Sequence, residues 1–128
     1  IIGLHVLKDM NKILKKKKKI CELYDKKLSK NLTSQQIDEN YTRNYNYSPV
    51  LFQSNDQLKK VLKILKKNNI FPRRYFYPSL NKLPYINQKK TLKNSENISS
   101  RILCLPNYYE LKHKEQMKII NLINSICI

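Results

Sequence analysis

The segment from Leu4 to Lys30 has the apolar periodicity of one long amphipathic helix. Its apolar side chains recur at intervals of three, four or seven residues, at Leu4, Leu7, Met10, Leu14, Cys21, Tyr24 and Leu28. This spacing places them on one stripe of an α-helix. The lysine run 15–19 covers more than one turn, so part of it must extend its stems along that stripe. We expect a helix over residues 4–30 with a solvated lysine face, although such a row can also bind phosphate or lipid headgroups.

A polar stretch and a short β-prone segment follow this helix. Residues 31–40 are polar without periodicity, which is typical of a loop. Residues 45–52 are rich in tyrosine and aliphatic side chains around Pro49, which predicts an edge strand or a strand that begins after the proline. Ser54 is a suitable N-cap, with Gln57 in the capping-box position, so a helix should start directly after this strand.

That helix is predicted over residues 55–68. Its apolar residues share one stripe opposite the lysines, and they are Leu58, Val61, Leu62 and Leu65. Residues 71–77 are the second strand candidate. Alternation would give this strand two faces, with Arg73, Tyr75 and Tyr77 on one and Arg74 and Phe76 on the other.

The last third of the chain predicts a long loop and two helices. Prolines and polar residues over 79–94 favour a long, mobile loop. Ser95 would start a short helix that contains Ile98, Ile102 and Leu103, and residues 111–126 carry the period of a closing helix. The alternation of helices and short strands predicts an α+β fold with a small sheet and helices packed on it.

The charge of the chain raises nucleic acid or an anionic membrane as partners. Lys and Arg number 26 against 9 acidic residues, giving a net charge of +17. Nearly all of this charge is lysine, however, and it is spread along a chain rich in Asn, Ile and Tyr with one glycine, a pattern typical of AT-rich coding. We therefore expect no specific nucleic acid and no membrane as partner.

Cysteine usage and hydropathy point to a reducing compartment. The thiols Cys21, Cys104 and Cys127 are odd in number and widely spaced, which favours small, partly buried thiols over a disulfide framework or a metal site. Lysines interrupt every apolar run before the roughly 18 residues needed to span a bilayer. We expect a cytoplasmic location. Because the sequence begins at Ile1 within a helical pattern, we also expect a piece of a longer protein.

Four segments, in order, resemble one enzyme family. The most specific is Ile-Phe-Pro-Arg-Arg-Tyr-Phe-Tyr-Pro-Ser-Leu at residues 70–80, followed by Leu83, Pro84 and Tyr85. The others are the long helix from Gly3 to Leu28, Asn-Tyr-Ser-Pro-Val-Leu-Phe at 46–52, and Ser95-Glu96 with Ser-Arg-Ile-Leu-Cys-Leu-Pro at 100–106. Together they resemble the DegT/DnrJ/EryC1/StrS aminotransferases that act on nucleotide-linked keto-deoxy sugars, over almost the entire chain.

This resemblance implies the small C-terminal domain of a fold-type I pyridoxal phosphate (PLP) enzyme. Residues 1–128 would form that single domain, and 1–30 would be the helix that links it to a large domain carrying the Schiff-base lysine and the phosphate-binding residues. No lysine here has the context of a Schiff-base lysine, so we assign no catalytic and no cofactor-binding residue. The resemblance also implies glutamate as amino donor, a homodimer and a role in surface polysaccharide synthesis for the complete enzyme. The chain would be a remnant or truncated product, inactive alone.

The predicted substrate contacts are Arg73, Arg74, Tyr75 and Tyr77. A guanidinium suits the pyrophosphate of a nucleotide sugar, and a tyrosine can cover a sugar ring and hydrogen-bond to it. Many relatives carry histidine where Tyr75 stands, which leaves the exact sugar open. The competing interpretation is that the tyrosines pack the sheet while the arginines pair with acidic groups of the large domain. The rival function is a small basic protein that binds RNA or DNA, whose affinity would fall steeply as salt rises.

Overall fold

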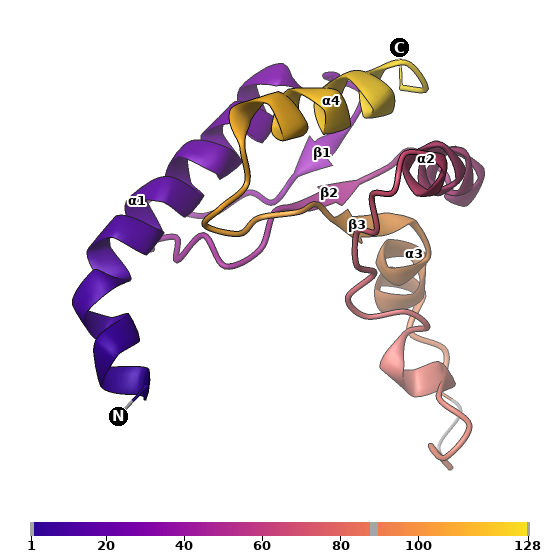
Figure 1. Cartoon of the computed structure of the whole chain (residues 1–128). Helices are drawn as coiled ribbons and strands as arrows, with labels where there is room; N and C mark the ends of the chain where they lie inside the picture. Colours follow the sequence, from indigo (N-terminus) through magenta and orange to yellow (C-terminus); the bar gives the residue numbers. More distant parts are fainter. Residues whose placement is uncertain (1, 88–89, 128) are drawn as a thin grey trace.

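The computed structural model describes residues 2–87 and 90–127, which form helices around a small antiparallel sheet (Figure 1). The elements in chain order are α1 (Ile2–Lys27), β1 (Thr33–Ser34), β2 (Pro49–Leu51), α2 (Asn55–Lys67), the short 3-10 helix η1 (Leu80–Lys82), α3 (Lys93–Arg101), β3 (Ile102–Cys104) and α4 (His113–Asn124). This order confirms the predicted α+β class.

Helix α1 confirms the predicted long amphipathic helix, but only its second half is packed. Ile20, Cys21 and Tyr24 are buried there, whereas Leu4 and Leu7 in the first half are 67% and 61% exposed. Figure 1 shows why, because the first half of α1 extends away from the other elements. The apolar stripe therefore continues beyond the part of the helix that is covered.

The three strands of the sheet lie in the order β1-β2-β3, and both pairings are antiparallel. Val50 of β2 faces Leu103 of β3 in register, and both side chains are buried against the helices. Because side chains alternate along a strand, Leu51 and Ile102 face the opposite side of the sheet, where they are only half-buried. One face of the sheet thus belongs to the core and the other stays accessible.

The start of α2 follows the predicted cap closely. The backbone N–H of Gln57 donates to Ser54 Oγ at 3.1 Å, which satisfies one free donor of the first turn. The Gln57 side chain reaches back one residue further than in a standard capping box and accepts from the N–H of Gln53 at 3.0 Å. Asn68 is the C-cap and Asn69 takes a φ of 58°, a conformation that asparagine tolerates at helix ends.

The core lies where α4 contacts both α1 and α2 above the covered face of the sheet. Leu58, Val61 and Leu65 of α2 are fully buried, which confirms the predicted stripe apart from Leu62, which is half-buried. From α4 the buried side chains are Gln116, Ile119, Ile120 and Ile123. Each periodic helix therefore contributes one apolar face to a common interior.

Two predictions for short segments are wrong. Ile102 and Leu103 do not continue a helix but begin β3, because backbone pairing with β2 and burial of Leu103 outweigh the local helical pattern. The 31–40 segment is not entirely loop, since Thr33 and Ser34 form the edge strand β1 on β2. Both errors concern strands of two or three residues, which are too short for local periodicity to distinguish them from a loop or a helix.

Within the predicted loop 79–94, η1 and the first turn of α3 are ordered around one carboxylate. Glu96 accepts from Asn81 Nδ2 at 2.8 Å, from the backbone N–H of Leu92 at 3.0 Å and from Lys82 Nζ at 2.7 Å. These bonds hold the pKa of Glu96 well below its ordinary value, at about 2, with the Lys82 contact as the largest cause. Residues 88–89 of this loop lie outside the described residues, and its mobility stays a prediction.

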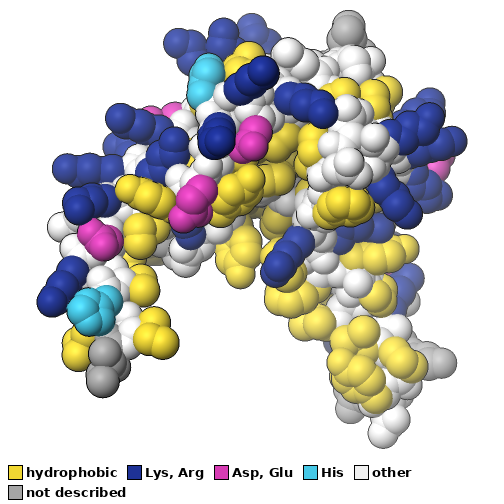
Figure 2. All heavy atoms as spheres, viewed as in Figure 1, with side chains coloured by type: hydrophobic (Ala, Val, Ile, Leu, Met, Phe, Trp, Pro, Cys, Tyr) yellow, Lys and Arg dark blue, Asp and Glu magenta, His cyan; other side chains and the backbone are white. Residues whose placement is uncertain are grey.

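The elements form an arch with a basic outer side. Figure 2 shows Lys and Arg side chains spread over α1, α4 and α2. Hydrophobic side chains gather along the inner side and on the two ends of the arch, which are the first half of α1 and the segment around η1. Over residues 2–87 and 90–127, no helix combines the length and the hydropathy that a membrane span requires.

Candidate substrate-binding site

The segment 71–78 crosses from α2 to the accessible side of the sheet, and it is not the predicted strand. Only Arg73 pairs with β3, through its carbonyl, which accepts from the N–H of Cys104 at 2.8 Å, and its N–H, which donates back at 3.3 Å. Pro72 and Pro78 supply no backbone N–H, so a longer ladder is not available to this segment. The predicted two-faced alternation of Arg73, Tyr75 and Tyr77 against Arg74 and Phe76 is therefore wrong, and turns follow Arg73 instead.

Arg73 and Tyr75 form an exposed pair beside the sheet. The Arg73 guanidinium is exposed and donates through Nη1 to the Tyr75 hydroxyl, which raises the pKa of Arg73 above its ordinary value. The guanidinium carbon also lies 5.9 Å from the centre of the Tyr75 ring. Since a guanidinium has five N–H donors, this pair leaves donors free for an anion.

Arg74 and Tyr77 are arranged differently, although both were predicted as substrate contacts. Arg74 Nη2 donates to the carbonyls of Ser99 and Ser100 at 3.2 and 2.8 Å, at the last turn of α3. Its guanidinium carbon lies 3.5 Å from the centre of the Tyr77 ring. Arg74 thus closes the end of a helix whose carbonyls carry partial negative charge. Contact of either residue with substrate stays a prediction.

Tyr47 is a neighbour of this site that sequence reasoning missed. Its ring meets the Tyr75 ring edge to face with 5.5 Å between centroids, and Tyr75 meets Phe76 in the same manner at 5.7 Å. Tyr47 remains 58% exposed despite these contacts. The alternation along 45–52 carried the available signal, because it places Tyr47 on the accessible face with Leu51.

Two hollows open on either side of the Tyr47–Tyr75 pair. One, of about 550 Å³, lies over the accessible face of the sheet and is mostly apolar; its lining includes Tyr47, Leu51, Tyr75, Phe76, Ile98 and Ile102. The other, of about 510 Å³, is more polar, and its lining includes Asn46, Tyr47, Phe71, Arg73, Tyr75 and Asn107. The two rings therefore form a common wall, with the Arg73 guanidinium on one side of it.

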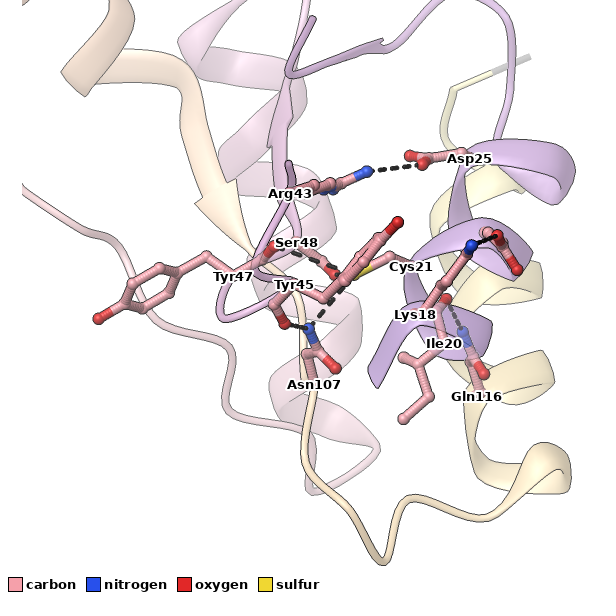
Figure 3. Close-up of polar contacts among 11 residues, drawn as sticks. Lys18, Ile20, Cys21, Asp25, Arg43, Tyr45, Tyr47, Ser48, Asn107 and Gln116 are labelled. Carbon is pink, nitrogen blue, oxygen red and sulfur yellow. Dashed lines mark hydrogen bonds and ion pairs between the residues drawn. The ribbon is translucent and has the colours of Figure 1, made fainter. Parts of the chain in front are cut away.

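The backbone that carries Tyr47 is fastened to α1 (Figure 3). Cys21 Sγ lies 3.1 Å from Ser48 Oγ, and Arg43 pairs with Asp25 at 3.0 Å. Asn107 Nδ2 donates to the carbonyl of Tyr45 at 2.8 Å and to Cys21 Sγ at 3.3 Å. Burial raises the pKa of the Cys21 thiol, so it is held here as a neutral group.

The described part of the chain offers no buried lysine for the Schiff base of a PLP enzyme. A Schiff base requires a lysine amine that can lose its proton, which burial in a pocket favours. The buried polar side chains of the described chain are Ser48, Ser79, Ser99 and Gln116, and none of them is a lysine. Nor do the described residues contain a group of three or more His, Cys, Asp or Glu that could hold a metal ion.

Comparison with known proteins accounts for nearly the whole chain. Residues 1–124 match the DegT/DnrJ/EryC1/StrS aminotransferase family, which confirms the resemblance of the four segments. The dTDP-4-amino-4,6-dideoxy-D-glucose transaminase of Escherichia coli is 30% identical over 94% of this chain and 35% of its own length. The chain therefore spans about a third of the length of this relative.

Solved structures show the same fold. DesI, determined in the presence of its TDP-sugar product, superimposes with a TM-score of 0.86 at 20% identity, over 98% of this chain and 34% of its own. The sugar aminotransferase Spr1654 from Streptococcus pneumoniae, in its PLP form, gives 0.86 at 19% identity over 98% and 34%. These likenesses establish that the chain has the fold of the matching third of such aminotransferases.

Proposed function

The chain belongs to the DegT/DnrJ/EryC1/StrS aminotransferase family, and on this premise we propose that it is the C-terminal part of a PLP-dependent aminotransferase of nucleotide-linked keto-deoxy sugars. Residues 1–128 form the small domain, with 1–30 as the helix that joins it to the cofactor-binding domain. The exposed first half of α1 supports this arrangement, since its apolar side chains have no cover within the described chain.

The observation that carries the proposal is the match to the E. coli transaminase across 94% of this chain. The arrangement at the accessible side of the sheet agrees with it. An exposed guanidinium stands beside a tyrosine that is half-buried and whose hydroxyl is already directed toward that guanidinium. A pyrophosphate and a sugar ring present the two chemistries that such a pair can bind.

In this proposal the residues of the chain bind and orient the substrate, and the cofactor is held by protein outside the chain. Arg73 takes the pyrophosphate, and Tyr75 keeps the guanidinium in place and covers the sugar. The complete enzyme uses glutamate as amino donor, works in the cytoplasm as a homodimer and supplies amino sugars to surface polysaccharide. Because none of the buried polar side chains of the described chain is a lysine that could form the Schiff base, we expect that the chain alone does not transaminate.

Titration of the purified chain with the dTDP-linked amino sugar tests substrate contact. We expect Arg73→Gln to weaken binding about tenfold, the loss expected for one charge-assisted contact. Lys60→Gln, on the exposed side of α2, removes one positive charge away from the site and should leave binding unchanged. Equal weakening by both variants would show that only net charge matters and would overturn the proposal.

A second assay tests the inactivity of the chain alone. Incubation with PLP, glutamate and the matching 4-keto sugar nucleotide should give no amino sugar, and measurable turnover would contradict the assignment of the cofactor to another part of the enzyme. The rival function, binding of RNA or DNA, finds no support among the relatives described above.

A further inference from the structure

We propose that Tyr47 is a further substrate-contacting residue, which stacks on the nucleobase, and that Cys21 and Asn107 position it. This inference rests on the proposed function, because it names the nucleobase as the part of the nucleotide sugar that contacts the Tyr47 ring. It concerns a residue 26 positions before Arg73 in sequence (73 − 47). The register of the sheet and the loops that flank it bring the two together.

The Tyr75 ring has two neighbours that could bind a ligand, a guanidinium and a second ring. The Arg73 guanidinium lies 5.9 Å from the centre of the Tyr75 ring, and the Tyr47 ring follows at 5.5 Å from Tyr75. The Tyr75 ring therefore has a cation at one contact and a second ring at another. A ligand that carries both an anionic group and a planar ring matches these two neighbours, and a nucleoside diphosphate has both.

The exposed ring of Tyr47 is already partly ordered. A tyrosine ring that is 58% exposed would ordinarily sample several rotamers, and ordering it costs free energy. Here the edge-to-face contact with Tyr75 already restricts the ring while it leaves much of the ring surface open to both hollows. Such a ring is prepared for stacking, because part of the ordering has occurred before a ligand arrives.

The backbone that precedes Tyr47 is held by Asn107. Tyr45 takes a φ of 54°, in the left-handed region that a bulky side chain rarely adopts. Asn107 Nδ2 holds it there by donating to its carbonyl at 2.8 Å. Since Asn107 faces a carbonyl, its amide nitrogen must be the atom that points to Tyr45, which fixes the side-chain orientation.

On the other side of Tyr47, its neighbour Ser48 is 4% exposed and meets the buried Cys21 thiol at 3.1 Å. Figure 3 shows that the Tyr47 side chain points away from α1. Lys17 Nζ adds an outer contact to Asn46 Oδ1 at 3.3 Å. The segment is therefore attached to α1 and to Asn107, while the Tyr47 ring between these attachments contacts Tyr75 and stays largely exposed.

The test compares two probes on the purified chain at about 0.15 M salt, where distant lysines are largely screened. Thymidine diphosphate carries both the ring and the anion, and inorganic pyrophosphate carries the anion alone. Tyr47→Ala should weaken thymidine diphosphate binding about tenfold, within the range for loss of one base–aromatic stack, and leave pyrophosphate binding unchanged. Tyr47→Phe should bind both probes as the parent chain does.

Asn107→Ala tests positioning, and it should weaken thymidine diphosphate binding without weakening pyrophosphate binding. A variant that merely loosened the fold would weaken both, so this difference separates the two roles. Arg73→Gln should weaken both probes. If Tyr47→Ala binds thymidine diphosphate like the parent while Arg73→Gln does not, the inference is overturned and the proposed function stands. If the parent binds neither probe, or Arg73→Gln changes neither affinity, the proposed function fails first.

Discussion

The guanidinium of Arg74 lies over the ring of Tyr77, with its central carbon 3.5 Å from the ring centre. The same guanidinium donates to the last carbonyls of α3. The guanidinium of its neighbour Arg73 is exposed, and within the described part of the chain it contacts the Tyr75 hydroxyl and ring. Two consecutive arginines thus have different tasks, one closing a helix and one facing solvent beside the aromatic wall.

This difference predicts different costs for the two alanine variants. Arg74→Ala removes two charge-assisted hydrogen bonds and a cation–π contact, and should lower the free energy of unfolding by about 2 kcal/mol. Arg73→Ala, made at an exposed side chain, should lower it by less than about 0.5 kcal/mol. Urea denaturation followed by circular dichroism measures both. Comparable losses in the two variants would contradict the assigned roles.

Glu96 should make stability depend on pH in the acid range. Its folded pKa of about 2 lies below the ordinary value of 4.5, so the charged carboxylate favours the folded state. This contribution is complete above about pH 4.5 and is lost as the pH falls toward 2. Across this pH window, the free energy of unfolding should fall more steeply with decreasing pH in the parent chain than in Glu96→Gln.

The matched control for this prediction is Glu39→Gln, which removes an exposed carboxylate between β1 and β2. It should keep the parent's slope in this window. Lys82→Gln removes the ammonium that lies 2.7 Å from Glu96. It should reduce the pH dependence of stability only in part, because the hydrogen bonds of Glu96 with Asn81 and the Leu92 N–H remain. If Glu96→Gln and Glu39→Gln behave alike, the network does not stabilise the charged carboxylate.

The three thiols should react slowly in the folded chain. Cys21, Cys104 and Cys127 are buried and unpaired by disulfides, and burial raises the pKa of each thiol. Less thiolate and less access both slow the reaction with a disulfide reagent. We expect slow labelling in buffer and rapid labelling of all three in urea. Asn11→Cys, on the exposed side of α1, should add one thiol that reacts at once. Rapid labelling of the folded parent chain, which lacks this added thiol, would contradict the burial of its three cysteines.

The helices α1, α2 and α4 were predictable from sequence because each has a repeated apolar stripe. Leu58, Val61 and Leu65 show the reason, since one face of α2 supplies three buried side chains at helical spacing. Strands of two or three residues have no such repeat. Leu103 lies in β3 because Val50 pairs with it, a long-range fact that residues 95–103 alone do not encode.

The candidate site was predictable only where its residues are adjacent in sequence. Arg73 and Tyr75 could be proposed together from a local motif, and they do contact one another. Tyr47 joins them only after the sheet and its loops are assembled, and its support by Cys21 and Asn107 comes from two further parts of the chain. Arg74 was grouped with Arg73 because sequence alone does not reveal that the end of α3 lies beside it.

The most direct measurement uses a chimera in which this chain replaces the matching third of the E. coli transaminase. We expect the chimera to transaminate the dTDP-linked sugar. We also expect Arg73→Gln within the chimera to lower kcat/KM at least about tenfold, while Lys60→Gln should not. A chimera that folds and binds PLP but has no activity, or whose activity is unchanged by Arg73→Gln, would contradict the account.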